Sequence, residues 1–293
     1  MRSLLALLFL TPLFACQSGG GAKGPFKVVG TTTMVVDMVR QVAGHRVSVQ
    51  GLLAPGGDPH VYRPLPADAQ AVAGAQLIFS NGLHLEPWLP DLIRQSGSQG
   101  RLVAVAEGLK TRVSPQDKSV PDPHVWFDVR RWKQAVGRVE RALSEFDPAG
   151  QTTFSANARL YERQLTVLDD WVQAQVGRIP KARRKLVTSH DAFAYFGEAY
   201  GFEVVPLQGI STESEASTRD MARVVEIVRG ASVPMVFVET SVNSRLIEQV
   251  ARETGVRVGG PLYSDSLGVL ESSAGTYTGM VRDNVALMVE GLQ

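Results

Sequence analysis

Apolar and polar positions alternate along the first half of the chain with two different periods. Short apolar runs, each bounded by turn-forming residues, predict strands at 27–32, 46–53, 75–82 and 101–106. Amphipathic stretches between them predict helices at 34–44 and 66–75, and the second opens with proline at a first-turn position. A further helix is predicted from Asp128, which is a good N-cap residue. Alternation of this kind indicates βαβ units around a parallel sheet.

One segment in the middle of the chain has a different pattern. Between Pro148 and Pro180 there is no proline, and glycine occurs only near the two ends. Apolar residues fall at steps of four and three, as on one face of a helix: Phe154, Ala158, Tyr161, Leu165, Leu168 and Val172. A helix of about 28 residues spans about 40 Å, which is the width of a whole lobe. The pattern therefore predicts one long, rigid helix.

Beyond this helix the alternation resumes. Strands are predicted at 185–189, 202–207 and 234–240, and helices at 218–229, from Asn243 to Gly255 and near 275–291. The first of these helices is preceded by a capping pattern, Ser217 to Asp220. The predicted fold is α/β, with two lobes that each hold a mainly parallel sheet flanked by helices. We expect an N-terminal lobe at 26–147, the linking helix at 148–180 and a C-terminal lobe at 181–293.

The first residues have the pattern of a targeting segment. Arg2 is followed by an apolar run, Leu4–Phe14, and then by Ala15 and Cys16, the only cysteine. The run is far shorter than the roughly 20 residues of a membrane-spanning helix, so residues 1–15 are predicted to be a signal peptide. The pattern resembles a bacterial lipoprotein box with lipid on Cys16; ordinary secretion is the alternative. Glycine and serine at 16–25 predict a flexible tether, so the body is expected outside the cytoplasm, near a membrane.

Charge and cysteine content narrow the possible functions. The chain carries 30 basic and 29 acidic residues, and removal of residues 1–15 removes one basic residue, which leaves the charges balanced. This composition gives no basic footprint for nucleic acid. With a single cysteine there is no internal disulfide, so an extracytoplasmic chain of this kind must be stabilised by burial. Its length favours two domains.

A repeated short motif supplies the first candidate chemistry. Asp-Pro-His-Val-aromatic occurs at 58–62 and again at 122–126, so two of the five histidines follow Asp-Pro. Proline fixes its own backbone and extends the residue before it, so that His60 and His124 are held stiffly. Asp58 and Asp122 could each accept a hydrogen bond from a nearby amide or from the histidine ring, in the second shell of a metal site. The alternative, an N-cap aspartate followed by proline, explains one copy but not two.

The second half of the chain offers two further candidates. His190 follows the first predicted strand of the second lobe, and Asp265 follows its last strand. Taken alone, each residue is more typical of a structural role. Together with His60 and His124, however, they would give two candidate ligands in each lobe, converging on a cleft. The remaining histidines are not expected to bind metal, because His45 fits a surface turn and His84 fits the first turn of a helix.

Six motifs, in order, resemble the solute-binding lipoproteins of zinc and manganese ABC transporters (cluster 9, also cluster A-I). They are "GGDPHVYRPLPAD", "NGLHLEPWL", "DPHVWFDV", "SHDAFAYFGEAYGF", "GISTESEAS" and "YSDSLGVLESSAGTYTGM". The resemblance covers nearly the whole mature chain, including the linking helix. It implies that His60 and His124 bind the metal from the first lobe, and His190 and Asp265 from the second. It also implies an ABC permease as partner, one metal ion per monomeric chain and no enzymatic activity.

Three imidazoles and one carboxylate suit Zn²⁺, whereas Mn²⁺ prefers oxygen-rich sites of higher coordination, so we expect zinc, with manganese as the alternative. Two other functions remain to be tested. One is a secreted zinc hydrolase, in which Glu239 could act as the general base. In a metal receptor, Glu239 could instead complete the second shell of the metal site. The plainer interpretation of Glu239 is a salt-bridged or helix-capping carboxylate. An adhesin with a structural metal would leave no recognisable motif.

Overall fold

The computed structural model describes residues 26–114, 117–231 and 233–293. The expected signal peptide, Cys16 and the tether lie outside the described residues. The strands are β1 (Lys27–Gly30), β2 (Ser48–Gly51), β3 (Leu77–Ser80), β4 (Arg101–Ala104), β5 (Lys185–Thr188), β6 (Glu203–Pro206), β7 (Met235–Glu239) and β8 (Arg257–Leu262). The helices are α1 (Thr33–Ala43), α2 (Pro66–Ala73), α3 (Leu89–Ser96), α4 (Val129–Phe146), α5 (Gln151–Val176), α6 (Ala194–Tyr200), α7 (Thr218–Gly230), α8 (Arg245–Thr254) and α9 (Tyr277–Leu292).

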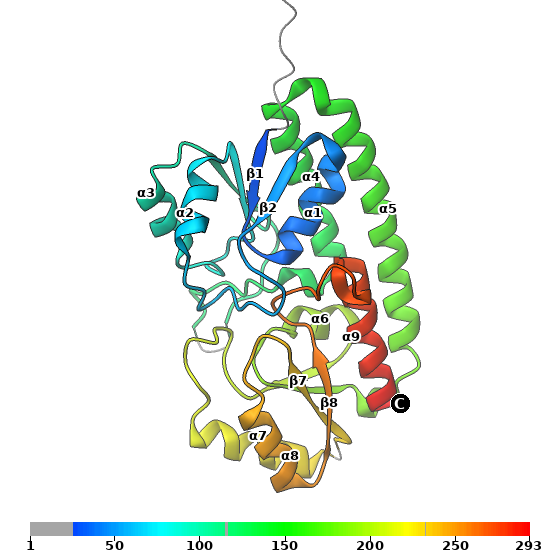
Figure 1. Ribbon diagram of the computed structural model, residues 1–293. Helices are drawn as coiled ribbons and strands as arrows, with labels where there is room; N and C mark the ends of the chain where they lie inside the picture. Colours follow the sequence, from blue (N-terminus) through cyan, green and yellow to red (C-terminus); the bar gives the residue numbers. More distant parts are fainter. Residues whose placement is uncertain (1–25, 115–116, 232) are drawn as a thin grey trace, which may run out of the picture.

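The first lobe is built on a parallel sheet of order β2-β1-β3-β4. Successive residues of β1 face opposite sides of this sheet, so that Val28 joins the core beneath α1 and α4, while Val29 joins the core beneath α2 and α3. Figure 1 shows these two helical layers on either side of the strands. Both faces of the central strands β1 and β3 are covered, which explains why these strands are almost wholly buried, whereas the edge strands β2 and β4 are partly exposed.

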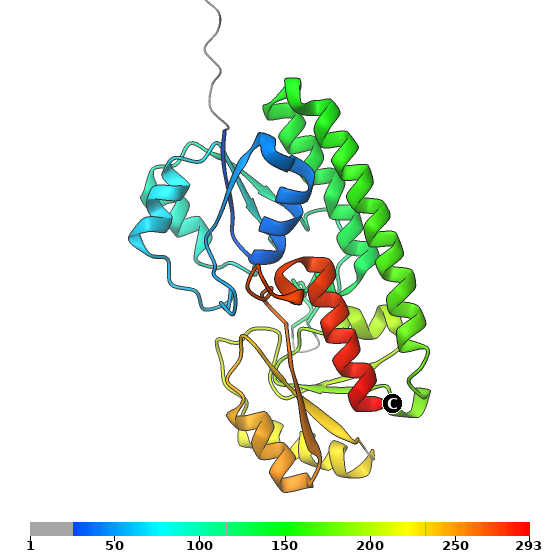
Figure 2. The same cartoon turned by 45° about the vertical axis from the view of Figure 1, so that its right-hand side comes forward.

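The second lobe contains two parallel strand pairs, β5-β6 and β7-β8. Helices α7 and α8 cover one face with a core of mostly valine side chains, while α6 and α9 lie on the other face. In the rotated view of Figure 2, α9 runs beside the lower part of α5. The lobe is therefore α/β and parallel, as predicted, with its strands paired as two short ladders.

Helix α5 connects the lobes and packs against both of them. Its buried face consists of the predicted apolar residues, among them Phe154, Leu165 and Val172. It contacts α1 and α4 of the first lobe and α6 and α9 of the second. One core cluster runs through all these helices, so the two lobes share buried apolar surface along the helix. The long joining helix is confirmed; the domain boundaries stay predictions.

Local signals fixed most helix starts correctly. Asp128 caps α4 through the amides of Arg130 and Arg131, and Ser217 forms a capping box with Asp220 at α7. Three elements had no predicted range: α3, α6 and β8. The expected helix start at His84 is wrong, because His84 has a left-handed φ of 63° and α3 begins only at Leu89.

Candidate metal site

The carboxyl ends of the parallel strands of both lobes face the space between the lobes. His60 and His124 lie in the loops that follow β2 and β4, and His190 lies two residues after β5. Asp265 follows β8. Open α/β sheets bind ligands at these strand ends, because the loops there converge while the backbone below them is fixed.

The structure brings all four predicted residues together. One donor atom from each of His60, His124, His190 and Asp265 lies within 4.8 Å of the others, and all four residues are buried. The Nε2 atoms of His60 and His124 are 3.3 Å apart. Asp265 Oδ1 is 3.5 Å from His124 Nε2, and Asp265 Oδ2 is 3.5 Å from His190 Nε2.

Two atoms at the centre of this cluster are buried without a partner. Among the described residues, His190 Nε2 and Asp265 Oδ1 form no hydrogen bond. A buried polar atom without a partner costs about 1–3 kcal/mol, so two such atoms in one cluster are not an arrangement that folding alone would favour. The donor set of three imidazoles and a carboxylate fits a divalent cation of the first transition row.

The two Asp-Pro-His copies adopt related conformations. In each, the aspartate accepts a hydrogen bond from the backbone N–H of the histidine two residues later, at 2.9 Å for Asp58 and 3.0 Å for Asp122. Asp122 also lies 2.8 Å from His124 Nδ1, whereas the second oxygen of Asp58 accepts a hydrogen bond from Thr212 of the other lobe. Neither copy begins an α-helix, so the alternative interpretation as an N-cap is wrong.

Both proline carbonyls of these motifs are held by side chains from one neighbouring loop. Trp88 Nε1 donates to the carbonyl of Pro59 at 2.8 Å, and Asn81 Nδ2 donates to that of Pro123 at 3.0 Å. Sequence reasoning missed both anchors, although each lies in or beside the motif "NGLHLEPWL". His60 and His124 are therefore held in place by the stiff Asp-Pro backbone and also by hydrogen bonds from a separate loop of the same lobe.

In the second lobe, the end of β7 positions both candidate ligands. Glu239 Oε2 lies 2.6 Å from His190 Nδ1, and its Oε1 accepts hydrogen bonds from the N–H groups of Ser189 and His190. Two residues later, Ser241 donates to Asp265 Oδ2 at 2.7 Å. Sequence reasoning did not identify Ser241; its only signal is its place at the strand end that carries Glu239.

The three histidines have different proton affinities in this site. Burial lowers the pKa of His60 to about 3, so its ring is neutral. Burial also disfavours protonated His124, but the hydrogen bonds to Asp122 and Asp265 outweigh it and raise its pKa to about 9. Burial is likewise outweighed at His190, where Glu239 and Asp265 raise the pKa well above its usual value. Burial opposes ionisation of Asp265, yet the two cationic rings hold its pKa well below the ordinary range.

The comparisons with known proteins agree with this geometry. A family model described as "Zinc-uptake complex component A periplasmic" matches residues 28–291. The chain belongs to this family. Its members are transport binding proteins and not enzymes.

The matches to individual relatives extend over almost the full length of this chain. The zinc-binding protein TroA of Treponema pallidum is 38% identical over 278 residues, covering 92% of this chain and 90% of that protein. The manganese-binding lipoprotein MntA of Bacillus subtilis is 37% identical over 302 residues, covering 99% of this chain and 97% of that protein. The solved structure of the treponemal periplasmic zinc-binding protein TroA superposes with a TM-score of 0.88, at 37% identity, covering 92% and 99% of the two chains. Within the described residues, no helix is long and apolar enough to cross a membrane.

Proposed function

We propose that this chain is an extracytoplasmic receptor that captures one Zn²⁺ ion between its lobes and delivers it to an ABC permease for import. The observation that carries the proposal is the buried set of His60, His124, His190 and Asp265. Two of its atoms have no other partner among the described residues. Membership in a zinc-uptake family supports the same conclusion.

The distances within the site favour zinc. A tetrahedron with metal–ligand distances of about 2.0–2.1 Å has edges of about 3.3 Å. His60 Nε2 lies 3.3 Å from His124 Nε2 and 3.9 Å from Asp265 Oδ1, and His124 Nε2 lies 3.5 Å from the same oxygen. His190 Nε2 lies 3.5 Å from the other oxygen, Asp265 Oδ2, so the donors are close to these edge lengths. Mn²⁺ favours more oxygen donors and a higher coordination number, and it remains the alternative cargo because MntA, a manganese-binding relative, is equally similar.

The geometry does not favour a zinc hydrolase. A catalytic zinc keeps one position open for water, with a general base nearby. Here Asp265 supplies a fourth protein donor, and both oxygens of Glu239 are engaged by His190 and its backbone. No observation in the described residues favours an adhesin.

We further propose that Cys16 carries lipid and anchors the receptor to the outer face of the bacterial membrane, in the periplasm or at the cell surface. Residues 16–25 would act as the tether. Relatives described as lipoproteins support this location. The permease subunit is the proposed partner of a monomeric chain, and no nucleic acid is expected.

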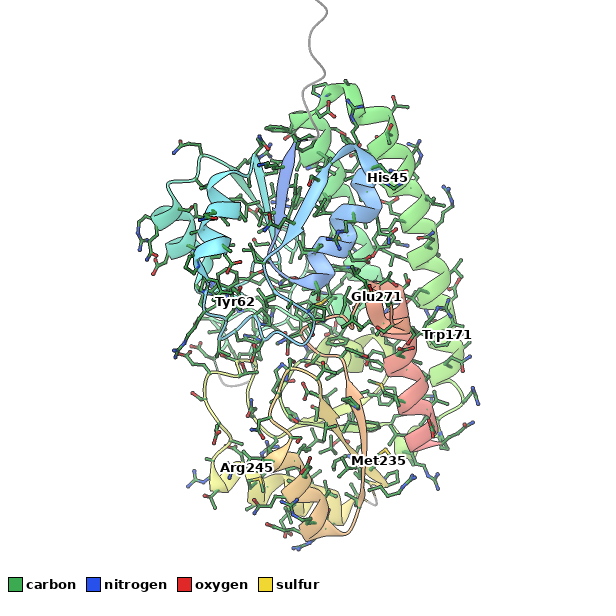
Figure 3. All side chains as sticks on the ribbon, in the orientation of Figure 1. His45, Tyr62, Trp171, Met235, Arg245 and Glu271 are labelled. Carbon is green, nitrogen blue, oxygen red and sulfur yellow. The ribbon has the colours of Figure 1, made fainter. Side chains whose placement is uncertain are left out.

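The proposal is tested with the metal-free mature protein. Competition against a chromophoric chelator should give one tightly bound Zn²⁺ per chain and weaker binding of Mn²⁺. The His124→Ala variant should bind zinc at least tenfold more weakly, because it loses one metal ligand and also the hydrogen bond by which Asp122 orients that ligand. His45→Ala is the matched control, since His45 is exposed and lies at the outer end of the first lobe in Figure 3.

A host strain that lacks the gene provides the second arm of the test. Growth under zinc limitation should be restored by the wild-type chain and by His45→Ala, but not by His124→Ala. Equal zinc binding by wild type and His124→Ala would show that the four-residue site is not the cargo site. Normal binding without restored growth would contradict the role in import.

A further inference from the structure

His60 is the candidate ligand nearest to solvent. Its side chain is 5% exposed, whereas the side chains of His124, His190 and Asp265 have no exposed surface. The passage between the metal site and solvent that requires the least movement of the protein therefore runs past His60.

A hydrogen bond between the two lobes lies directly beside His60. Asp58 Oδ1 accepts a hydrogen bond from the backbone N–H of His60 at 2.9 Å, and Asp58 Oδ2 accepts one from Thr212 Oγ1 at 2.5 Å. Thr212 belongs to the loop between β6 and α7 of the second lobe. Asp58 also interacts electrostatically with Asp265 and His190, so this hydrogen bond lies close to the metal site.

This bond differs in kind from those that join the lobes near the other ligands. The hydroxyl of Tyr195 donates to the backbone carbonyl of Asp122 at 2.9 Å, and the backbone N–H of Leu267 donates to a first-lobe hydroxyl at 2.7 Å. Each of these two bonds fixes a backbone segment. Asp58 and Thr212 are joined through side chains alone, so their bond can break by side-chain rotation while both backbones stay in place.

The loop that carries Thr212 also has room to move. Each residue from 211 to 217 is exposed or half-buried. The loop borders a hollow of about 420 Å³, whose lining includes Ile210 and Ser214 of the second lobe and Val120 of the first. Side chains therefore do not fill the space between the loop and the first lobe there.

We propose that the metal enters and leaves the site past His60, and that Thr212 is a positioning residue that closes this passage through Asp58. The inference rests on the proposed metal-receptor function. A hydrogen bond from a hydroxyl to a carboxylate is charge-assisted and about twice as strong as a neutral one. This bond involves no donor atom of the metal site, so it slows entry and exit alike and leaves the equilibrium affinity almost unchanged. A contact that only stabilised the loaded form would slow exit alone.

The test compares the zinc kinetics of wild type, Thr212→Val and Thr212→Ser. Mixing the zinc-loaded protein with a large excess of a chromophoric chelator gives the dissociation rate constant, and competition at equilibrium gives the Kd. The association rate constant follows from these two values. Thr212→Val keeps the shape and removes the hydroxyl, so both rate constants should rise about tenfold while the Kd stays within about threefold. Thr212→Ser keeps the hydroxyl and should show wild-type rates, as should the matched control Ser214→Ala, since Ser214 is exposed on the same loop.

A double-mutant cycle shows whether Thr212 acts through Asp58. Asp58→Asn keeps an acceptor oxygen for the amide of His60 but removes the charge, so it should speed zinc exchange by a smaller factor. Thr212→Val combined with Asp58→Asn should exchange zinc no faster than Thr212→Val alone, because the same bond can be removed only once. Circular dichroism and thermal unfolding of the metal-free proteins check the fold, and Thr212→Ala replaces Thr212→Val if that variant does not fold.

Three results would overturn the inference. An unchanged dissociation rate in Thr212→Val would mean that zinc does not leave past this bond. Faster dissociation with an equally weakened Kd would mean that Thr212 only stabilises the loaded form. Effects that multiply in the double variant would mean that Thr212 acts independently of Asp58.

His124→Ala separates this inference from the proposed function. If His124→Ala binds zinc like wild type, the proposed function and the inference fail together. If His124→Ala loses zinc binding as expected while Thr212→Val exchanges zinc at the wild-type rate, the inference alone fails.

Discussion

Zinc binding should expel about two protons at neutral pH. In the metal-free site, His60 is neutral because burial lowers its pKa to about 3, and Asp265 is already ionised. His124, with its pKa raised to about 9, and His190, with its pKa raised well above the usual value, are both protonated at pH 7. A metal ion must displace these two protons, since only neutral imidazole is a ligand.

The magnitude follows from this count. Each displaced proton changes the apparent affinity about tenfold per pH unit, so two protons give about 100-fold, or ~2.7 kcal/mol, per unit. Affinity should therefore fall as the pH falls below about 9, the pKa of His124, and should change less above it. Between pH 8 and pH 6 the expected loss is about 10,000-fold.

Calorimetry in buffers with different ionisation enthalpies measures how many protons are released when zinc binds at pH 7. Glu239→Gln removes the carboxylate beside His190 and should reduce the number released to about one, because the pKa of His190 then falls. Glu203→Gln is the matched control, since Glu203 is an exposed carboxylate that pairs with Lys185. Release of no protons, or affinity that varies only around pH 6.5 as for three independent histidines, would refute this electrostatic account.

Three further predictions concern stability and motion. Zinc at a thousandfold excess over its Kd should stabilise the folded protein by about 4 kcal/mol, seen as a higher melting temperature that a chelator reverses; no shift would argue against a site shared by both lobes. Because α5 packs on both lobes without an internal proline or glycine, X-ray scattering should give nearly equal radii of gyration with and without zinc, and marked compaction would contradict a rigid joint. Leu165→Ala should cost about 2–5 kcal/mol in chemical unfolding, while Val167→Ala, which is 62% exposed, should cost less than about 0.5 kcal/mol; equal costs would mean that the buried stripe is misassigned.

The sequence was most informative where short-range physics decides the structure. The spacing of Phe154, Leu165 and Val172 places them on one face of a helix, and this face can be recognised without knowing which elements pack against it. The stiff Asp-Pro-His motif likewise identified His60 and His124 from local backbone restriction. Each aspartate accepts a hydrogen bond from the amide of its histidine, which is one of the two expected contacts, and Asp122 also contacts the ring of His124.

Contacts between distant segments could not be predicted in this way. Ser241 reaches Asp265 because β7 and β8 are paired, and Trp126 reaches Ser264 across the two lobes. Neither contact leaves a periodic or spacing signal in the chain. The left-handed turn at His84 was missed for a related reason, since the buried carboxylate of Glu86 binds the N–H groups of Asn81 and Gly82 and holds that loop out of a helix.

X-ray absorption at the zinc edge of the loaded protein shows whether these four residues bind the metal, because it counts the ligands around the ion. We expect a single zinc environment of four light-atom ligands at about 2.0–2.1 Å, with the outer-shell scattering of three imidazole rings. A six-coordinate shell, or scattering from fewer than two imidazoles, would contradict a site made of His60, His124, His190 and Asp265.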